Sequence, residues 1–272
     1  MLRENEVPFL LPGILSRGES FQALGFDTED VVEYDEPGEG DFDAHRIVCD
    51  VAVMIMSNLN DGLPTLLVGA SVGGMMIPFI VGKLRRLMPD IRLDMLRCVI
   101  IDAPFGVETM IAARRSRLAG YLIRSPFGHV LRPLASIKVG PRDKYIETPD
   151  ADMMRQIAGE TRTDAGWHAY VKERAIDELT GHSSRQWLEQ IRWMTRVGHD
   201  GSLHRACQGM MGVDTAYLAC TGPANDVVTQ PLASEWWAAS LPDLRMYGVS
   251  AAHCGFVQQA PTFRGALAEI LG

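Results

Sequence analysis

Short apolar runs alternate along the chain with longer stretches in which apolar residues recur at helical spacing. The short runs are nearly continuous, as in "PTLLVGA" at 64–70, which is typical of parallel strands covered on both faces. The pattern predicts strands at 7–12, 30–35, 64–70, 96–104, 215–222 and 244–250, and helices near 18–25 and at 43–60, 72–87, 231–240 and 261–271. Alternating strands and helices require crossover connections. We therefore expect an α/β protein with a mostly parallel sheet of about six strands flanked by helices.

One long segment interrupts this alternation. Residues 107–210 contain many Arg, Met and Trp residues and carry little strand signal. Amphipathic helices are predicted within it at 109–124, 151–160, 165–179 and 184–196. We therefore predict an α-helical insertion at 107–210, and an α/β core built from residues 1–106 and 211–272.

Composition narrows the class of protein. The formal net charge of −8 argues against a nucleic-acid partner, because such a protein needs a basic face. The five cysteines include no CxxC pair, so they suggest neither a zinc site nor a disulfide framework, and a reduced, cytoplasmic compartment fits best. Acidic residues precede the apolar run of "MLRENEVPFLLPGIL", which we interpret as a strand rather than a signal peptide. No segment approaches the roughly 20 apolar residues of a membrane span.

A single serine stands at the junction of a predicted strand and a predicted helix. The stretch "LLVGASVGG" contains Gly69-Ala70-Ser71-Val72-Gly73, a GxSxG pattern. In the strand–turn–helix context this pattern indicates a nucleophile elbow, in which small neighbours let the chain turn sharply around the serine. The alternative is a glycine-rich turn whose serine only caps the following helix.

A serine hydroxyl needs a base, and the base needs a carboxylate. His253 is the best candidate base because it follows the last predicted strand, where the functional groups of parallel sheets gather. Asp226, after the preceding strand, is our candidate acid. Asp102 is its rival because "IIDAP" also ends a strand, whereas Asp214 precedes its strand and belongs to the wrong end of the sheet.

Acyl transfer at a serine also needs N–H donors for the oxyanion. The N–H of Val72, at the start of the helix, is one candidate. The loop after the first strand, "LLPGILS", provides the other: Ile14 is the first choice and Leu15 the second. The alternative is that Pro12-Gly13 is simply a turn.

Together these residues resemble the α/β-hydrolase superfamily. The order Ser71, Asp226, His253 matches the order of nucleophile, acid and base in that family. "LLPGI" is similar to its oxyanion loop, with Pro12 in place of the usual His, and "EYDEPGEG" is similar to its D-x-x-G-x-G turn. The resemblance covers about 7–106 and 213–272, and residues 107–210 correspond in position to the helical cap of many members. The family's N-terminal two-strand hairpin is missing here, and Ala252 replaces the Gly before the histidine.

The resemblance implies a serine hydrolase that cleaves a carboxylic ester of a small or medium apolar substrate, with no cofactor and no metal. A thioesterase, a C–C bond hydrolase, a proline aminopeptidase and an acyltransferase stay open, as does a small-molecule receptor with a weak triad. Met75, Met110 and Trp167 are candidate pocket residues, although apolar residues at helical spacing more often belong to the core. The expected partner is a small-molecule substrate, without a nucleic acid or a membrane span, and a homodimer stays open.

Overall fold

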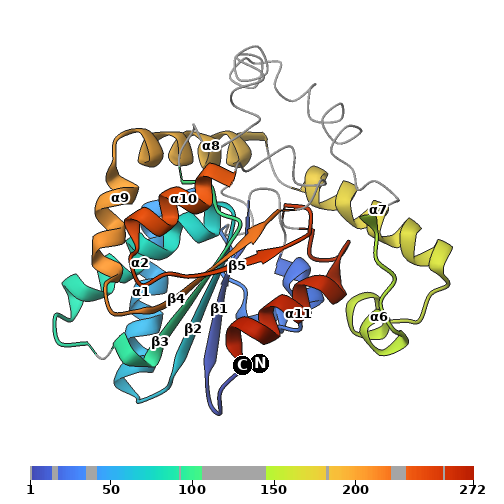
Figure 1. Ribbon diagram of the computed structural model, residues 1–272, viewed down its shortest axis with the longest axis horizontal. Helices are drawn as coiled ribbons and strands as arrows, with labels where there is room; N and C mark the ends of the chain where they lie inside the picture. The colour runs from blue at the N-terminus through green and yellow to red at the C-terminus, as the bar shows by residue number, and fades with distance from the viewer. Residues whose placement is uncertain are drawn as a thin grey trace.

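The computed structural model describes residues 2–13, 18–34, 42–91, 93–105, 145–181, 184–221, 231–253 and 255–272. Within these residues, one sheet of five parallel strands runs through the middle of the protein in the order β1-β2-β3-β4-β5 (Figure 1). The strands are β1 (Val7–Leu11), β2 (Thr65–Ala70), β3 (Leu96–Ile101), β4 (Asp214–Cys220) and β5 (Arg245–Val249). Because all pairings are parallel, the carboxyl ends of the five strands lie along one edge of the sheet. The predicted α/β class is confirmed.

Alternate strand residues feed two separate hydrophobic clusters, one on each face of the sheet. The α2-side cluster includes Leu67 and Tyr217, and the α11-side cluster includes Leu66 and Leu218. The helices that contribute to the α2-side cluster are α1 (Ala44–Asn60), α2 (Val72–Leu87), α8 (Ser184–His199), α9 (Ser202–Cys207) and α10 (Pro231–Ser240). Those of the α11-side cluster are the 3-10 helix η1 (Gly18–Leu24), α6 (Ala151–Ala158), α7 (Asp164–Gly181) and α11 (Ala260–Leu271). Both faces are therefore covered, which explains why the strands lack polar alternation.

The helix ends follow local chemistry. The Asp43 carboxylate accepts hydrogen bonds from the amides of His45 and Arg46, and so caps the first turn of α1. Arg85 and Arg86 stand in the last turn of α2, where positive charge complements the helix dipole. The predicted helix near 18–25 is the 3-10 helix η1 instead of an α-helix.

The sheet has one strand fewer than the approximately six expected. The predicted strand at 30–35 is reduced to a single parallel bridge between Val31 and Leu10, supported by the Val32 N–H, which donates to the Leu10 carbonyl at 2.9 Å. A 3-10 turn, η2 (Thr28–Asp30), ends at the first residue of the predicted strand, and among the described residues 30–34 only Val31 forms a bridge. This bridge still pairs with the outer side of β1 and partly covers that sheet edge.

The predicted insertion, 107–210, includes residues 107–144, which lie outside the described part. Its described helices, α6 to α9, pack into the two clusters that flank the sheet, through residues such as Val171 and Trp193. Figure 1 shows α8 and α9 beside α2, and α6 and α7 beyond α11. A separate cap domain at 107–210 therefore stays a prediction.

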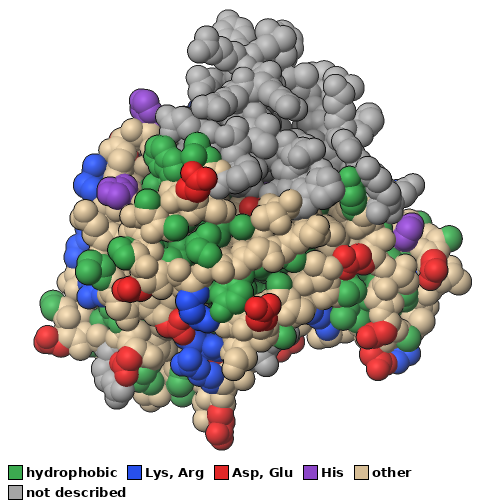
Figure 2. All heavy atoms as spheres, viewed as in Figure 1, with side chains coloured by type: hydrophobic (Ala, Val, Ile, Leu, Met, Phe, Trp, Pro, Cys, Tyr) green, Lys and Arg blue, Asp and Glu red, His purple; other side chains and the backbone are tan. Residues whose placement is uncertain are grey.

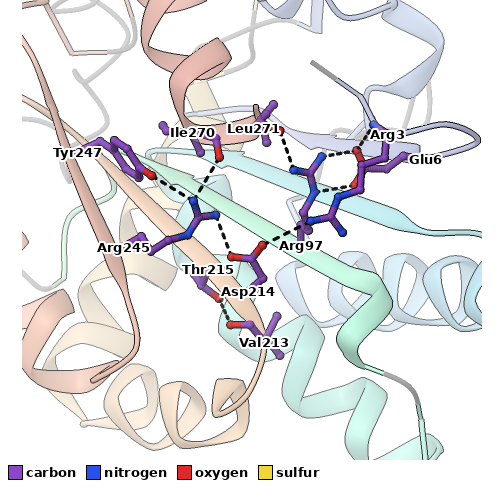
Figure 3. A network of polar contacts seen from close by, with 10 residues as sticks. All are labelled: Arg3, Glu6, Arg97, Val213, Asp214, Thr215, Arg245, Tyr247, Ile270 and Leu271. Atoms are coloured by element: carbon purple, nitrogen blue, oxygen red, sulfur yellow. Dashed lines mark hydrogen bonds and ion pairs between the residues drawn. The ribbon is translucent and has the colours of Figure 1, made fainter.

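A polar network joins the amino ends of the strands to the end of α11 (Figure 3). Arg97, at the start of β3, forms a two-pronged ion pair with Glu6, with N···O distances of 2.7 and 2.5 Å. A third nitrogen of Arg97 donates to the Leu271 carbonyl at 3.1 Å. Arg245 on β5 similarly bridges Asp214 and the Ile270 carbonyl. The network thus ties the first strand to the last helix, beside which both chain termini lie.

The surface charges and the cysteine thiols add little to the identification of a functional site. No helix in the described part of the chain is both long and apolar enough to span a membrane. On the face in Figure 2, acidic and basic side chains are interspersed over the described atoms, without a broad basic surface. Burial raises the pKa of the Cys98 thiol far above its usual value, and burial raises that of Cys207 to about 12, so neither is a reactive thiolate.

Candidate active site

Three side chains meet at the carboxyl edge of the sheet. Ser71 directly follows β2, Asp102 directly follows β3, and His253 lies four residues after β5. The strand order leaves only β4 between the last two. Residues far apart in sequence therefore converge where parallel strands end, the usual position of ligand sites in such sheets.

Ser71 has the conformation of a sharp turn between β2 and α2. Its φ is 51° and its ψ is −116°, in a region that non-glycine residues rarely occupy. A Cβ added at Gly73 would lie 2.2 Å from the Leu11 carbonyl oxygen, and one at Gly69 would lie 2.6 Å from Gly73. The glycines are therefore required for the strand and helix to approach one another. The Ser71 side chain makes no capping hydrogen bond to α2, which removes the interpretation that it is merely a helix cap.

His253 connects the serine to a carboxylate. Its Nε2 lies 3.2 Å from Ser71 Oγ, and its Nδ1 lies 2.5 Å from Asp102 Oδ2. An ionised carboxylate only accepts, so Nδ1 must carry the proton, and Nε2 of a neutral imidazole then accepts from the serine hydroxyl. In this arrangement the imidazole can take the serine proton while the carboxylate stabilises the resulting cation.

The Asp102 carboxylate is held firmly in this position. Asp102 has a φ of 44°, its backbone N–H donates to the Leu218 carbonyl at 2.8 Å, and its Oδ1 accepts from the Cys220 N–H at 3.3 Å. Its side chain is only 3% exposed. Strained backbone of this kind is found where the surrounding structure over-determines a conformation, most often at functional sites. Asp226, the acid that the sequence favoured, lies outside the described residues, and the carboxylate on His253 is that of its rival.

Part of the predicted oxyanion loop also lies against the serine. A Cβ added at Gly13 would be 3.1 Å from the Ser71 Cβ, so the backbone there passes close to the nucleophile. The Tyr34 hydroxyl donates to the Pro12 carbonyl at 2.8 Å and anchors the start of this loop. Val72 is the first residue of α2, where backbone N–H groups lack intrahelical acceptors. Ile14 and Leu15 lie outside the described residues.

Comparisons with known proteins agree with this architecture. No protein-family model matches the sequence, and a search of the curated proteins finds no match. Among solved structures, the chain is similar to a candidate aryl esterase from Burkholderia cenocepacia, at 15% identity and a TM-score of 0.63 over 98% of this chain and 90% of that one. The enol-lactonase from Burkholderia xenovorans LB400 matches at 13% identity and a TM-score of 0.62 over 97% and 90% of the chains. A hydrolase from Pseudomonas aeruginosa PA01 matches at 17% identity and 0.60 over 100% and 91%.

The chain has the α/β-hydrolase fold. The resemblance inferred from the sequence motifs is thereby confirmed at the level of the fold. In that fold the nucleophile elbow lies between a strand and the following helix, which is where Ser71 lies between β2 and α2. The order nucleophile, acid, base holds with Asp102 as well as with Asp226, so chain order alone does not choose between them.

Three hydrogen bonds near the candidate site were not predicted from the sequence. The Ala103 carbonyl, next to Asp102, accepts hydrogen bonds from both the Tyr217 hydroxyl at 3.0 Å and the Trp237 indole N–H at 2.8 Å. The Gln259 side chain accepts from the N–H of Ala252, beside His253, at 2.6 Å. Buried polar groups inside apolar runs, such as Tyr217 in "TAYLACTG", were the available signal, but sequence does not reveal their partners.

The predicted pocket residues that the structure describes do not lie together. Met75 is fully buried in the α2-side cluster. Trp167 is fully buried in the α11-side cluster, and its indole N–H donates to the Glu147 carbonyl. The two therefore pack on opposite faces of the sheet, and Met110 lies outside the described residues. Within the described part of the α/β-hydrolase fold, no group of three or more His, Cys, Asp or Glu residues is arranged to hold a metal ion.

Proposed function

We propose that this protein is a serine hydrolase that cleaves carboxylic esters of small or medium apolar substrates. Ser71 is the nucleophile, His253 the general base and acid, and Asp102 the carboxylate that orients the imidazole. The observation that carries the proposal is the continuous contact from Asp102 through both ring nitrogens of His253 to Ser71 Oγ.

The proposed reaction is a two-step acyl transfer. His253 Nε2 accepts the Ser71 proton as Oγ attacks the ester carbonyl, and the N–H groups of Val72 and Ile14 stabilise the oxyanion. The tetrahedral intermediate collapses to an acyl-serine as His253 returns the proton to the leaving alcohol. Water, deprotonated by His253, then attacks the acyl-serine and releases the acid and free Ser71.

Three observations favour Asp102 as the partner of His253. Its oxygen is within hydrogen-bond distance of Nδ1, its carboxyl group is nearly inaccessible to water, and its backbone is locked by the Leu218 carbonyl. A buried carboxylate beside an imidazole stabilises the imidazolium more strongly than one exposed to water. Asp226 is the second candidate for this role.

Ester substrates are supported by the site and by the neighbours. Ser71 is only 4% exposed and adjoins the buried apolar residues Val72 and Met75 of α2, so a small apolar acyl group suits its surroundings better than a charged one. Two of the similar structures are described as an aryl esterase and an enol-lactonase, and a lactone is a cyclic ester. We therefore place esters ahead of thioesters and amides.

The test is hydrolysis of p-nitrophenyl esters, from acetate to palmitate, by the wild type and by Ser71→Ala. We expect a serine-dependent rate with an optimum at short or medium acyl chains. A fluorophosphonate probe should label the wild type and not Ser71→Ala. Labelling without turnover of any ester would replace the esterase with a narrower serine hydrolase or an acyltransferase, and neither labelling nor turnover would refute the proposal in favour of a receptor.

A further inference from the structure

A cavity lies along the C-terminal half of α2, away from the serine. It has a volume of about 190 Å³ and is formed between the last turns of α2 and the segment of α9 and the 3-10 helix η6 (Gln208–Met210). At about 1.5 Å per residue, the lining residues Pro78 to Arg86 lie roughly 9 to 20 Å along the helix from Val72, and none of them belongs to the candidate active site. This cavity is therefore distinct from the candidate active site.

Three guanidinium groups line this cavity: those of Arg85, Arg86 and Arg205. Among the described residues, no carboxylate forms an ion pair with any of them. Hydrogen bonds from Ser202, and to a smaller extent the nearby charges of Arg205 and Arg196, lower the pKa of Asp200, so this carboxylate is a negative charge close to Arg205. In the described part of the chain, Arg85 and Arg86 form no ion pair, although the net charge of the protein is −8.

Backbone carbonyls hold the three guanidinium groups in place. Arg85 donates to the carbonyls of Gly209, at 2.6 Å from Nε, and Met211. Arg86 Nε donates to the Gly82 carbonyl at 3.3 Å, and Arg205 Nη1 to the Asp200 carbonyl at 3.2 Å. These contacts use one or two donors of each guanidinium, which has five N–H donors in all. At least three N–H donors of each guanidinium are not used in these contacts, so they can bind a ligand.

The floor of the cavity leaves room for a compact ligand. A Cβ added at Gly209 would come within 3.3 Å of the Gly82 Cα, so the backbones of α2 and η6 approach closely. At Gly82 itself, an added Cβ would meet no atom within 4 Å. The two glycines thus keep the space beneath the arginines free of side chains.

We propose that this arginine-lined cavity binds a phosphate group, either as free phosphate or as the phosphate of a small monoester. A carboxylate has two oxygens, which a single arginine can satisfy through its two-pronged geometry. Three separate guanidinium groups around one cavity match a tetrahedral dianion, which presents more oxygens and more charge. The proposal does not depend on the reaction at Ser71.

Calorimetric titration with inorganic phosphate, and separately with glycerol phosphate, tests the proposal. Both titrations use the full chain at constant ionic strength, with chloride as the reference anion. The variants are Arg86→Gln and Arg205→Gln, because Arg85 also anchors η6 and its loss would disturb the fold. The matched control is Arg192→Gln, which removes one positive charge from α8, where Arg192 pairs with Glu189 outside the cavity.

We expect saturable binding of phosphate, weakened about tenfold or more by each cavity variant, since one charge-assisted hydrogen bond is lost, and unchanged by Arg192→Gln. Tighter binding of the monoester would identify an esterified phosphate as the natural ligand, and tighter binding of inorganic phosphate would identify the free ion. Absence of saturable binding above chloride would overturn the proposal. Equal weakening by Arg192→Gln would also overturn it, because the effect would then be a general one of net charge.

Discussion

The two ends of the sheet each contain a buried carboxylate beside a base, and the two pairs are built in opposite ways. At the amino end, Glu6 meets Arg97 through two parallel hydrogen bonds (Figure 3). At the carboxyl end, Asp102 meets only one nitrogen of His253, and the other nitrogen faces Ser71. The first arrangement uses its donors to join parts of the chain, whereas the second leaves a ring nitrogen directed at the Ser71 hydroxyl.

The backbone conformation also differs between the two ends of the sheet. At the amino end, Glu6 and Arg97 have no positive φ, and the positive φ of 60° belongs to Asn5, a residue type that tolerates this conformation. The third nitrogen of Arg97 closes the end of α11 at the Leu271 carbonyl. Ser71 and Asp102 both have positive φ. Strain of this kind costs about 1–3 kcal/mol per residue. On the proposed function, one end of the sheet therefore stabilises the fold, and the other uses that stability to hold the catalytic groups in position.

The largest expected effect is at the carboxyl end. Asp102→Asn keeps the shape of the side chain but offers an N–H to a ring nitrogen that must itself donate, so the wrong tautomer of His253 is favoured. We expect kcat for ester hydrolysis to fall by up to about 10⁴, equivalent to about 5 kcal/mol, measured with p-nitrophenyl esters.

Asp226→Asn is the matched control for that substitution. It should keep the rate within about tenfold, because on our assignment the carboxylate on His253 is Asp102. The opposite result, with activity lost in Asp226→Asn and kept in Asp102→Asn, would return the acid role to Asp226. Unfolding by denaturant should show that both variants are folded.

The sequence predicted more of the carboxyl end of the sheet than of the amino end. The glycines around Ser71, the position of His253 after the last strand and the α/β alternation are local patterns. They were sufficient to predict the fold, and they pointed to two residues that the structure brings within 3.2 Å of each other. The choice of acid was not local, because Asp102 and Asp226 both follow predicted strands and sequence does not give the distance from a carboxylate to His253; the structure gives this distance for Asp102, at 2.5 Å. Glu6 and Arg97 are 91 residues apart, and no pattern connects them.

The same limit explains the differences in the fold. The apolar run at 30–35 has strand composition, but the 3-10 turn η2 ends beside it and one bridge to Leu10 remains. Trp167 has the spacing of a helix face, which does not tell a pocket from a core, and its burial in the α11-side cluster places it in the core. Periodicity identifies which face of an element is apolar, but not what that face contacts.

The second largest effect is expected at the amino end. Glu6→Gln leaves the Arg97 charge buried without a counter-charge, which should lower the free energy of unfolding by about 3–5 kcal/mol. Glu189→Gln removes a carboxylate from the exposed pair with Arg192 and should cost at most about 1 kcal/mol. Denaturant unfolding measures both, and kcat/KM of the folded Glu6→Gln protein should match the wild type. A loss from Glu6→Gln no larger than that from Glu189→Gln would show that the buried pair contributes little.

Lowering the pH should reproduce, in the wild type, part of the destabilisation expected of Glu6→Gln. Burial raises the pKa of Glu6, but the hydrogen bonds from Arg97 and the Arg3 amide outweigh burial, so the pKa lies below its ordinary value of 4.5. A carboxyl group with a lowered folded-state pKa stabilises the protein above its unfolded-state pKa, and this contribution is lost as pH falls through the folded-state pKa. The difference in unfolding free energy between wild type and Glu6→Gln should therefore shrink between about pH 4.5 and pH 3. A difference that stays constant over this range would contradict the lowered pKa.

The smallest expected effects come from two hydroxyl groups on β4, one toward each end of the sheet. On β4, the Thr215 hydroxyl donates to the Val213 carbonyl at the amino end, and the Tyr217 hydroxyl donates to the Ala103 carbonyl beside Asp102. Thr215→Val and Tyr217→Phe each remove one buried hydrogen bond, so each should lower the free energy of unfolding by about 0.5–1.5 kcal/mol. Only Tyr217→Phe should also lower kcat, by a few-fold and with KM unchanged, because it loosens the turn that carries Asp102 while Trp237 still holds Ala103. Equal kcat in the two variants would show that Tyr217 contributes only to folding, and that Trp237 alone suffices to position the carboxylate.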